Sequence, residues 1–238
     1  MRRLMLLLAA MGAAVLLVSG VALAATITGT NGPNFLEGTP NPDLLKGLGG
    51  GDKINGKGSG DELKGNEGFD DVCGENGNDT YSGGDGDDHL SEYDIDECGL
   101  NPEPDGDGFT GADDQFGGEG ADFLEAARGP DLEFGGPNSD DLFGDTGFDE
   151  LHGGSGPDEM EGEQGSDRMF GDAGADELDA ADQETVDSPD LVDGGDGTDT
   201  CIVNENDDVS NCEDIDTEPN PTLTTAASAT EDSTGNNR

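Results

Sequence analysis

Tryptophan is absent from this 238-residue sequence, and basic and apolar residues are scarce. Aromatic residues make up 5% and hydrophobic residues 30% of the chain, and 9 lysines and arginines stand against 57 aspartates and glutamates. So little apolar material makes a conventional globular core hard to build, and composition alone favours intrinsic disorder. The net charge of −48 argues against nucleic acid and anionic membranes as partners, because both would repel the chain. Dense carboxylates favour hard cations instead, above all calcium.

Catalytic motifs are also missing from the sequence. It contains no GxSxG elbow, no HExxH helix and no GK[ST] phosphate loop. Its two histidines, His89 and His152, are not near a cysteine cluster, and we expect both on the surface. Paired carboxylates occur everywhere and therefore do not indicate a glycosidase. We expect no enzymatic activity.

The N-terminus has the pattern of a secretory signal peptide. Arg2 and Arg3 precede an apolar run from Leu4 to Val18, and Ala22-Leu23-Ala24 forms a small-residue cleavage site. An uncleaved membrane anchor is the alternative, although the apolar run is short for a span. We expect residues 1–24 to be removed and the mature protein to be secreted, either free in the extracellular space or associated with the cell surface. No membrane span would remain.

A period of nine residues runs through nearly the whole mature chain. Gly83 to Ser91 reads GGDGDDHLS, and Gly117 to Glu125 reads GGEGADFLE. Seventeen such units begin at positions 29, 38, 47, 56, 65, 74, 83, 108, 117, 126, 135, 144, 153, 162, 171, 185 and 194. A repeat of this kind predicts a solenoid, in which stacked units share one thin core.

Three positions of the unit, here called columns, carry the pattern. Column four is glycine in thirteen units, and column eight is apolar in fifteen, the exceptions being Gln115 and Glu133. Column six is aspartate in every unit except the first, which has Asn34. The sixteen candidate metal ligands are Asp43, Asp52, Asp61, Asp70, Asp79, Asp88, Asp113, Asp122, Asp131, Asp140, Asp149, Asp158, Asp167, Asp176, Asp190 and Asp199.

Each column predicts one structural role. Glycines permit a tight turn and let carbonyl oxygens approach an ion. The column-six carboxylate would lie at the end of that turn, facing the same way in every unit. The three residues that follow would form a short strand whose column-eight side chain points inward.

The pattern GGxGxDxUx resembles the hemolysin-type calcium-binding repeat of RTX proteins. The resemblance covers residues 29–202 apart from two breaks. It implies an all-β fold, a right-handed parallel β-roll (β-solenoid) of stacked nonapeptide repeats with two units in each turn. Calcium ions would lie between stacked turns, held by turn carbonyls and column-six carboxylates. Aspartates eighteen residues apart would then share an ion, for example Asp122 with Asp140 and Asp140 with Asp158, which gives about ten ions in all.

Electrostatics explain why calcium would matter to such a roll. Stacked turns would place carboxylates roughly 5 Å apart, near the interstrand spacing. Each pair would repel by about 1 kcal/mol in water and by about 3 kcal/mol at an effective dielectric near 20. Summed over many pairs, this repulsion rivals the stability of an ordinary domain, about 5–15 kcal/mol. We therefore expect calcium binding and folding to be one event.

Two breaks and the chain ends complete the predicted organisation. After the signal peptide (1–24), a first repeat run (25–91) is followed by an inserted loop (92–107) and a second run (108–202) that contains an insertion at 180–184. Residues 203–215 would cap the last strands, and residues 216–238 would form a disordered tail. Four cysteines in an exported chain suggest disulfides, of which three pairings are possible; proximity favours Cys73 with Cys98 and Cys201 with Cys212.

The sequence predicts a secreted calcium-binding protein, but it leaves the biological role open. One hypothesis is a monomer with a structural or adhesive extracellular role, in contact with a cell-surface or extracellular polysaccharide or protein. The other is an accessory or regulatory subunit of a separate secreted enzyme or toxin. Many RTX proteins are large toxins, lipases or proteases that typically leave by a C-terminal signal. We instead expect this chain to be exported by its N-terminal signal and to contain no such domain.

Overall fold

The protein is a flattened roll of parallel strands. A computed structural model describes residues 24–91, 111–181 and 188–217. In this described part all regular elements are strands, so the predicted all-β parallel β-roll is confirmed. No helix in these ranges is long and apolar enough to span a membrane. The predicted signal peptide, apart from Ala24, lies outside the described residues.

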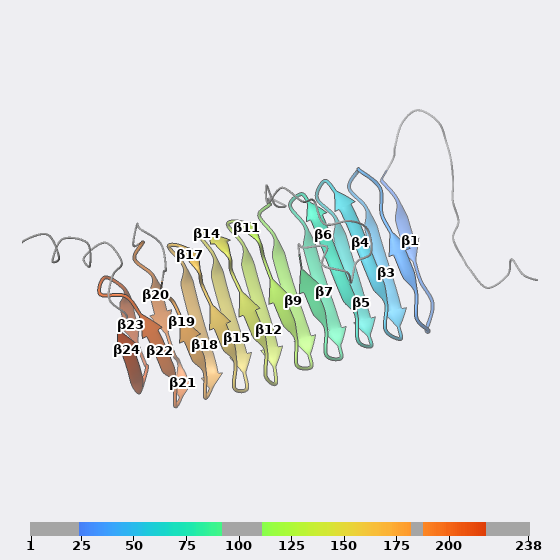
Figure 1. The fold of residues 1–238 in the computed structure, drawn as a ribbon. Coiled ribbons are helices and arrows are strands. Elements are labelled where there is room, and N and C mark those ends of the chain that lie inside the picture. The colour runs from blue at the N-terminus through green and yellow to red at the C-terminus, as the bar shows by residue number, and fades with distance from the viewer. Residues whose placement is uncertain (1–23, 92–110, 182–187, 218–238) are drawn as a thin grey trace, which may run out of the picture.

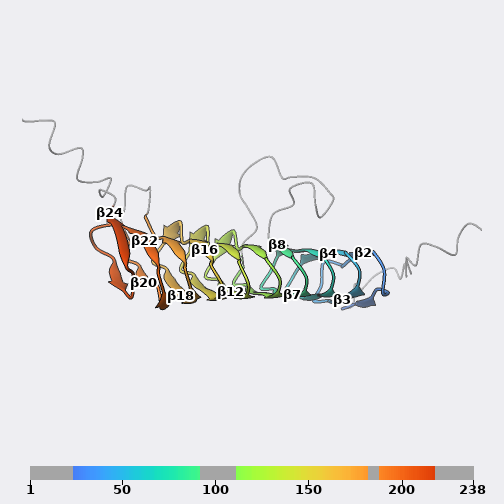
Figure 2. The same cartoon turned by 90° about the horizontal axis from the view of Figure 1, so that it is seen from below.

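Two long sheets form the two layers of the roll (Figures 1 and 2). In the described part, the path of sheet A contains β1 (Thr26–Thr28), β3 (Leu44–Gly49), β5 (Glu62–Glu67), β7 (Thr80–Asp85), β9 (Asp114–Glu119), β12 (Leu132–Pro137), β15 (Glu150–Ser155), β18 (Arg168–Gly174), β20 (Leu191–Asp193) and β23 (Asp208–Ser210), with β21 (Asp196–Gly197) beside β18. Sheet B contains β2 (Phe35–Glu37), β4 (Lys53–Gly58), β6 (Asp71–Asn76), β8 (His89–Ser91), β10 (Phe123–Glu125), β13 (Asp141–Phe143), β16 (Glu159–Glu161), β19 (Glu177–Asp179), β22 (Thr200–Val203) and β24 (Asp214–Thr217).

A third, smaller sheet lies at the edge of the roll where the chain passes from sheet B to sheet A. It is formed by β11 (Arg128–Gly129), β14 (Thr146–Gly147) and β17 (Gln164–Gly165). Consecutive long strands alternate between sheets A and B, so each coil contributes one strand to each layer. Leu44 pairs with Glu62, and Lys53 pairs with Asp71, a shift of eighteen residues in both sheets. Two nonapeptides therefore make one coil, as the resemblance implied.

The core is a double row of column-eight side chains between the two sheets. All fifteen apolar members of this column are buried, most of them completely, including Leu45, Ile54 and Leu142. The two polar exceptions, Gln115 and Glu133, also point inward and are 0% exposed. The alternation of strand side chains thus decides burial here even against residue polarity.

The two breaks in the repeat appear as changes of register. Thr80 of β7 pairs with Asp114 of β9, a shift of 34 residues, sixteen more than the regular eighteen. Arg168 of β18 pairs with Leu191 of β20, a shift of 23 residues, five more than the regular eighteen. These differences equal the lengths of the breaks at 92–107 and 180–184. The sheets therefore continue across both breaks in their normal alternation.

The C-terminal end of the roll has its own strand pairing. Residues 203–215 were expected to cap the last strands; in the structure β23 pairs with β20 and β24 with β22, which adds a further, shorter coil. Leu191 pairs with Asp208 at a shift of 17, and Thr200 pairs with Asp214 at a shift of 14. β24 also continues two residues past the predicted boundary at 215, because its four residues pair with the four residues of β22.

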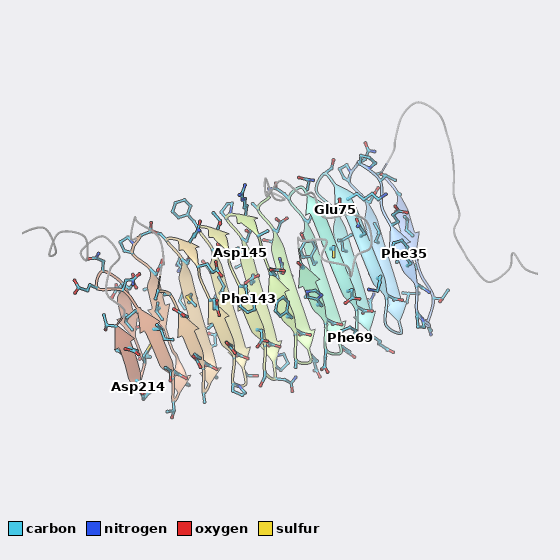
Figure 3. The ribbon with its side chains drawn as sticks, viewed as in Figure 1. Phe35, Phe69, Glu75, Phe143, Asp145 and Asp214 are labelled. Carbon is cyan, nitrogen blue, oxygen red and sulfur yellow. A yellow bond between two sulfur atoms is a disulfide. The ribbon has the colours of Figure 1, made fainter. Side chains whose placement is uncertain are left out.

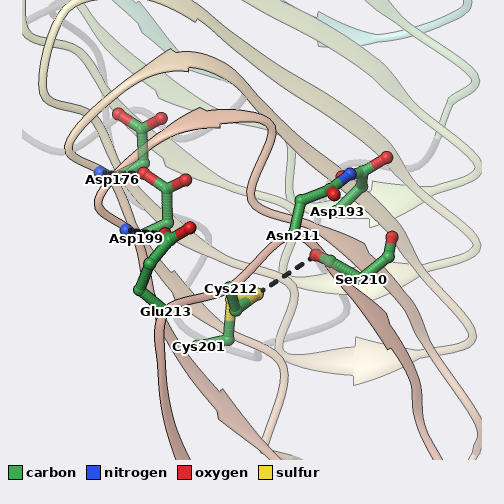
Figure 4. The surroundings of a disulfide bond; sticks show 8 residues. All are labelled: Asp176, Asp193, Asp199, Cys201, Ser210, Asn211, Cys212 and Glu213. Atoms are coloured by element: carbon green, nitrogen blue, oxygen red, sulfur yellow. Dashed lines mark hydrogen bonds between the residues drawn. A yellow bond between two sulfur atoms is a disulfide. The ribbon is translucent and has the colours of Figure 1, made fainter.

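Two of the four cysteines are joined at this end of the roll. The predicted disulfide between Cys201 and Cys212 is confirmed, and it links β22 to the segment before β24 (Figure 4). Cys73 is also disulfide-bonded. Its predicted partner, Cys98, lies outside the described residues.

Candidate metal centre

The sixteen predicted aspartates form two rows, one along each edge of the roll. Each of them is at most 5% exposed and directly precedes a strand. Row A precedes the strands of sheet A and contains Asp43, Asp61, Asp79, Asp113, Asp131, Asp149, Asp167 and Asp190. Row B precedes the strands of sheet B and contains Asp52, Asp70, Asp88, Asp122, Asp140, Asp158, Asp176 and Asp199.

A ladder of hydrogen bonds connects neighbouring aspartates within each row. The backbone N–H of Asp122 donates to Oδ1 of Asp140 at 2.8 Å, and that of Asp140 donates to Oδ1 of Asp158 at 2.9 Å. The ladder also crosses the first break, since the N–H of Asp88 donates to Oδ1 of Asp122. One oxygen of each carboxylate thus fixes its position against the coil before it. The aspartates that the resemblance paired, Asp122 with Asp140 and Asp140 with Asp158, are neighbours in row B.

The other carboxylate oxygen is left without a donor in most of the ladder. Among the described residues, Oδ2 is buried and accepts no hydrogen bond in Asp52, Asp61, Asp70, Asp79, Asp88, Asp122, Asp131, Asp140, Asp149, Asp158, Asp176 and Asp199. A buried polar atom without a partner costs about 1–3 kcal/mol, and a charged one costs more. So regular a set of unsatisfied oxygens calls for a positive partner.

Backbone oxygens converge on the same positions from the glycine turns. A Cβ atom on Gly135 would lie 2.6 Å from Oδ2 of Asp140 and 2.8 Å from the carbonyl oxygen of Gly153 in the next coil. Gly117 has the same surroundings, with Oδ2 of Asp122 and the carbonyl of Gly135. Glycine in column one therefore keeps open a space bordered by carboxylate and carbonyl oxygens. These are the donors that calcium prefers, and side chains there would fill the space.

The oxygen donors of each position come mostly from backbone. No group of three or more His, Cys, Asp or Glu side chains in the described residues is arranged to hold a metal ion. A zinc-type cage of side chains is therefore not what these turns offer. One or two carboxylates with several carbonyls, in a flexible turn, suit calcium instead.

Burial also raises the pKa of row aspartates in the middle of the roll, such as Asp140 and Asp149. Desolvation raises the pKa of Asp149 to about 8 and that of Asp140 to about 7, although the backbone hydrogen bond to each carboxylate acts in the opposite direction. Neighbouring aspartates of the same row raise both values further. In the absence of a cation, the folded roll therefore takes up protons near neutral pH.

The ends of the two rows are built differently from their middle. Oδ2 of Asp43 accepts a hydrogen bond from the N–H of Thr39 in its own turn. Asn34, which precedes Asp52 in row B, accepts from the N–H of Thr30 and donates to the carbonyl of Gly32 at 2.6 Å. The N-terminal turns thus satisfy their own polar atoms.

Two residues at the C-terminal end extend the rows and were missed in the sequence. Oδ1 of Asp207 accepts from the N–H of Asp190, and Oε2 of Glu213 accepts from the N–H of Asp199 at 2.9 Å. Figure 4 shows Asp176, Asp199 and Glu213 following one another along row B. The signal was present, since residues 207–210 read DDVS and residues 213–216 read EDID, both with an acid two positions before an apolar residue. The strict nine-residue spacing concealed it.

The two histidines lie on the outer faces of the sheets. His152 of β15 stacks between Phe134 and Phe170 at ring-centroid distances of 4.6 and 4.7 Å, and Phe134 in turn stacks on Phe116. His89 of β8 contacts Phe123 edge to face. Both histidines are partly exposed, as expected, and belong to aromatic rows that run across the strands.

Buried rows of carboxylates at the glycine turns of a parallel β-roll define the class of a calcium-binding repeat protein. The family model described as the RTX calcium-binding nonapeptide repeat (4 copies) matches residues 28–63, 56–90, 107–142, 116–151, 134–169 and 143–178. Together these segments cover more than half of the chain. The chain belongs to the RTX calcium-binding nonapeptide repeat family. A search of curated proteins found no match.

Proposed function

We infer that this chain is a secreted protein that folds when calcium binds to its two aspartate rows, and that it then has a structural or adhesive role outside the cell. The observation that carries this proposal is the repeated buried Oδ2 atom without a hydrogen-bond donor. All sixteen column-six aspartates are the proposed ligands, together with turn carbonyls, and about ten ions would bind. Bound calcium supplies the positive charge that the packed carboxylates need.

Folding and binding would be coupled because the same residues serve both. A row aspartate such as Asp140 ties two coils together through Oδ1 and leaves Oδ2 without a hydrogen-bond donor beside the glycine turn. Without cations the roll would have to keep many like charges buried side by side, at a cost comparable to the whole stability of a domain. The metal-free chain should therefore be expanded.

The decisive experiment compares the mature protein in EDTA and in millimolar calcium. Circular dichroism should show a gain of β structure with calcium, and the hydrodynamic radius should fall. Magnesium should act poorly, because it demands octahedral geometry and gives up its waters reluctantly. An identical spectrum and radius in EDTA and in calcium would falsify the proposal.

Export is a separate part of the proposal, and it rests on the sequence of residues 1–24. The mature protein should begin at Ala25 and be found outside the cytoplasm. N-terminal sequencing of protein from the culture medium tests this. Protein found in membranes with Met1 intact would contradict it.

The outer face of sheet A supports an adhesive role. It is extended, as the binding surfaces of solenoids are, and it contains an open depression lined by Phe116, Phe134 and Pro137 beside Asp85 and Glu119. Retention on an extracellular polysaccharide column in calcium, with elution by chelator, would favour adhesion. No catalysis by this chain is part of the proposal.

The alternative role is that of an accessory or regulatory subunit of a separate secreted enzyme or toxin. Pull-down from culture medium with and without chelator separates it from adhesion. Recovery of a second protein whose activity requires this chain would favour the accessory role.

A further inference from the structure

The inner row of sheet A is interrupted by two polar side chains that the aspartate rows do not use. Gln115 of β9 and Glu133 of β12 are paired across adjacent strands and are both 0% exposed. The corresponding residues of sheet B, Leu124 and Leu142, are apolar and fully buried. Two neighbouring polar residues therefore replace apolar residues on one side of the core only.

These side chains leave a set of buried oxygens without hydrogen-bond donors. The amide nitrogen Nε2 of Gln115 donates to the backbone oxygen of Glu125 at 3.0 Å, which leaves its oxygen Oε1 in the interior. Among the described residues, Oε1 of Gln115, both carboxylate oxygens of Glu133 and Oδ2 of Asp145 are buried and accept no hydrogen bond. A fully buried carboxylate with neither oxygen satisfied is among the costliest groups a core can contain.

The position of Glu133 follows from its equivalents in other coils. In sheet A the column-eight side chain reaches the column-one residue of the turn seven positions earlier. A Cβ atom on Gly74 would meet the hydroxyl of Tyr81, and one on Gly162 would meet the sulfur of Met169. By the same geometry Glu133 lies beneath position 126.

Position 126 is itself exceptional. Here the residue is Ala126, which is 0% exposed, so a methyl group stands in the space that column-one glycines keep open in neighbouring turns. Asp145 occupies column two of the next turn along the same edge, at φ 61°, and is labelled in Figure 3. The charges of Asp149, Asp131, Asp145 and Glu125 all act on Glu133. Glu133 thus lies at the turn in which Ala126 replaces the column-one glycine.

We propose that Glu133, Asp145 and the amide oxygen of Gln115 hold a calcium ion beneath position 126, on the inner side of row A. All donors are oxygens, which suits a hard cation, and two carboxylates balance its charge of two. As a carboxylate Glu133 can only accept, and none of the described residues donates a hydrogen bond to it, so a cation would supply the partner that it lacks. The site goes beyond the proposed function, because the row aspartates need neither Glu133 nor Gln115.

Counting ions on calcium-loaded mature protein by native mass spectrometry tests the site. The variant Glu133→Leu restores the residue that column eight most often contains, so a merely structural defect would be repaired by it. We expect Glu133→Leu to retain one fewer calcium ion than the wild type. Gln115→Leu, which changes no charge, should lose the same ion at a calcium concentration at which the wild type retains it.

The matched control is Glu159→Gln, which removes a carboxylate from the exposed outer face of sheet B and should leave the ion count unchanged. If Glu133→Leu does not fold in calcium, Glu133→Gln, which keeps the shape of the side chain, is judged by the same count. An ion count equal to that of the wild type would overturn the inference and assign a proton to Glu133. Such a result would leave the proposed function intact, whereas a wild type that binds no calcium would refute the proposed function itself.

Discussion

The middle of the roll and its ends satisfy the same buried residue in different ways. In the middle, Asp140 uses one oxygen in the ladder and leaves the other without a donor. At the N-terminal end, Asp43 uses both oxygens, the second bonded to Thr39 of its own turn. At the C-terminal end, Oδ2 of Asp207 likewise accepts from the N–H of Asn204 at 2.6 Å.

This difference shows which part of the fold depends on metal. In the end turns of Asp43 and Asp207, one carboxylate oxygen accepts from the coil before it and the other accepts from the turn's own backbone. A middle turn has coils on both sides and offers its spare oxygen to the space between them. We expect the middle to need calcium and the ends to tolerate its absence, and this expectation can be tested in order of decreasing effect.

The largest effect should come from pH in the absence of metal. The folded pKa values of the middle aspartates, from about 6 for Asp158 to about 8 for Asp149, exceed the ordinary value of 3.8. The metal-free roll therefore binds more protons than the unfolded chain, so its stability should rise as pH falls from 8 toward 4 and be lost as pH rises again.

Circular dichroism and size-exclusion chromatography in EDTA across this range measure the effect. In calcium the trend reverses, since protons compete for the same oxygens and lower the apparent affinity. A metal-free protein equally expanded at pH 8 and pH 5 would contradict the burial of these carboxylates.

The next effect is the contrast between Asp140→Asn and Asp43→Asn. Asp140 lies mid-row between two coils, so its loss should weaken both adjacent sites and remove about two of about ten ions, while distant sites persist because solenoid couplings are nearest-neighbour. Asp43 has no spare oxygen, and its substitution should remove at most about one ion. Calorimetric titration of both variants gives the counts. If both variants lost the same number of ions, middle and end turns would not differ in calcium binding.

A smaller, local effect is expected from the C-terminal disulfide. In the chain-entropy model, closing the loop between Cys201 and Cys212 stabilises by about 3 kcal/mol. The double substitution Cys201→Ser, Cys212→Ser should increase hydrogen exchange in β22, β23 and β24 of the calcium-loaded protein. Exchange in β4 and β5 serves as the internal control and should not change. A uniform increase along the chain would show that the ends and the middle do not behave separately.

The smallest effect should come from the aromatic row on the outer face of sheet A. Phe116 stacks on Phe134 with ring planes 3° apart, and an aromatic pair of this kind contributes about 0.5–1.5 kcal/mol. Phe116→Ala should lower the stability of the calcium-loaded roll by about 1 kcal/mol in denaturant unfolding. Phe148→Ala is the control, because Phe148 is 71% exposed and makes no ring contact among the described residues. Equal losses of stability in the two variants would show that the stacking of Phe116 does not stabilise the roll.

Much of the fold was readable from three columns. Column six predicted where each turn ends, and column eight predicted which side chains point inward. The inward direction is found even for Gln115 and Glu133, because position on the strand outweighs polarity. Column two could not be predicted, because most units depart there from the glycine of the pattern GGxGxDxUx. The structure gives several of its non-glycine residues positive φ, 89° at Leu48 and 86° at Lys57, a conformation that residue identity alone did not suggest.

The rest of the site was hidden by spacing. Asp207 and Glu213 extend the rows only because the last coil is shortened, and a strict period of nine passes over them. The hydrogen bonds that Asn34 and Asp43 make within their own turns depend on side-chain directions, which the repeat pattern does not predict. The repeat pattern therefore predicts the middle of the two aspartate rows but not the structure of their ends.

The alternation of strands between two layers also restricts how such a chain can change in length. A duplication of eighteen residues would add one coil and return every later strand to its own sheet. A duplication of nine would send every later strand to the opposite sheet, so that Glu133, for example, would leave sheet A for sheet B. Extra residues between β8 and β9, by contrast, leave the alternation intact, as the pairing of Thr80 with Asp114 shows. Descendants of this sequence should therefore grow by whole coils, and should vary freely only where the chain passes from one layer to the other.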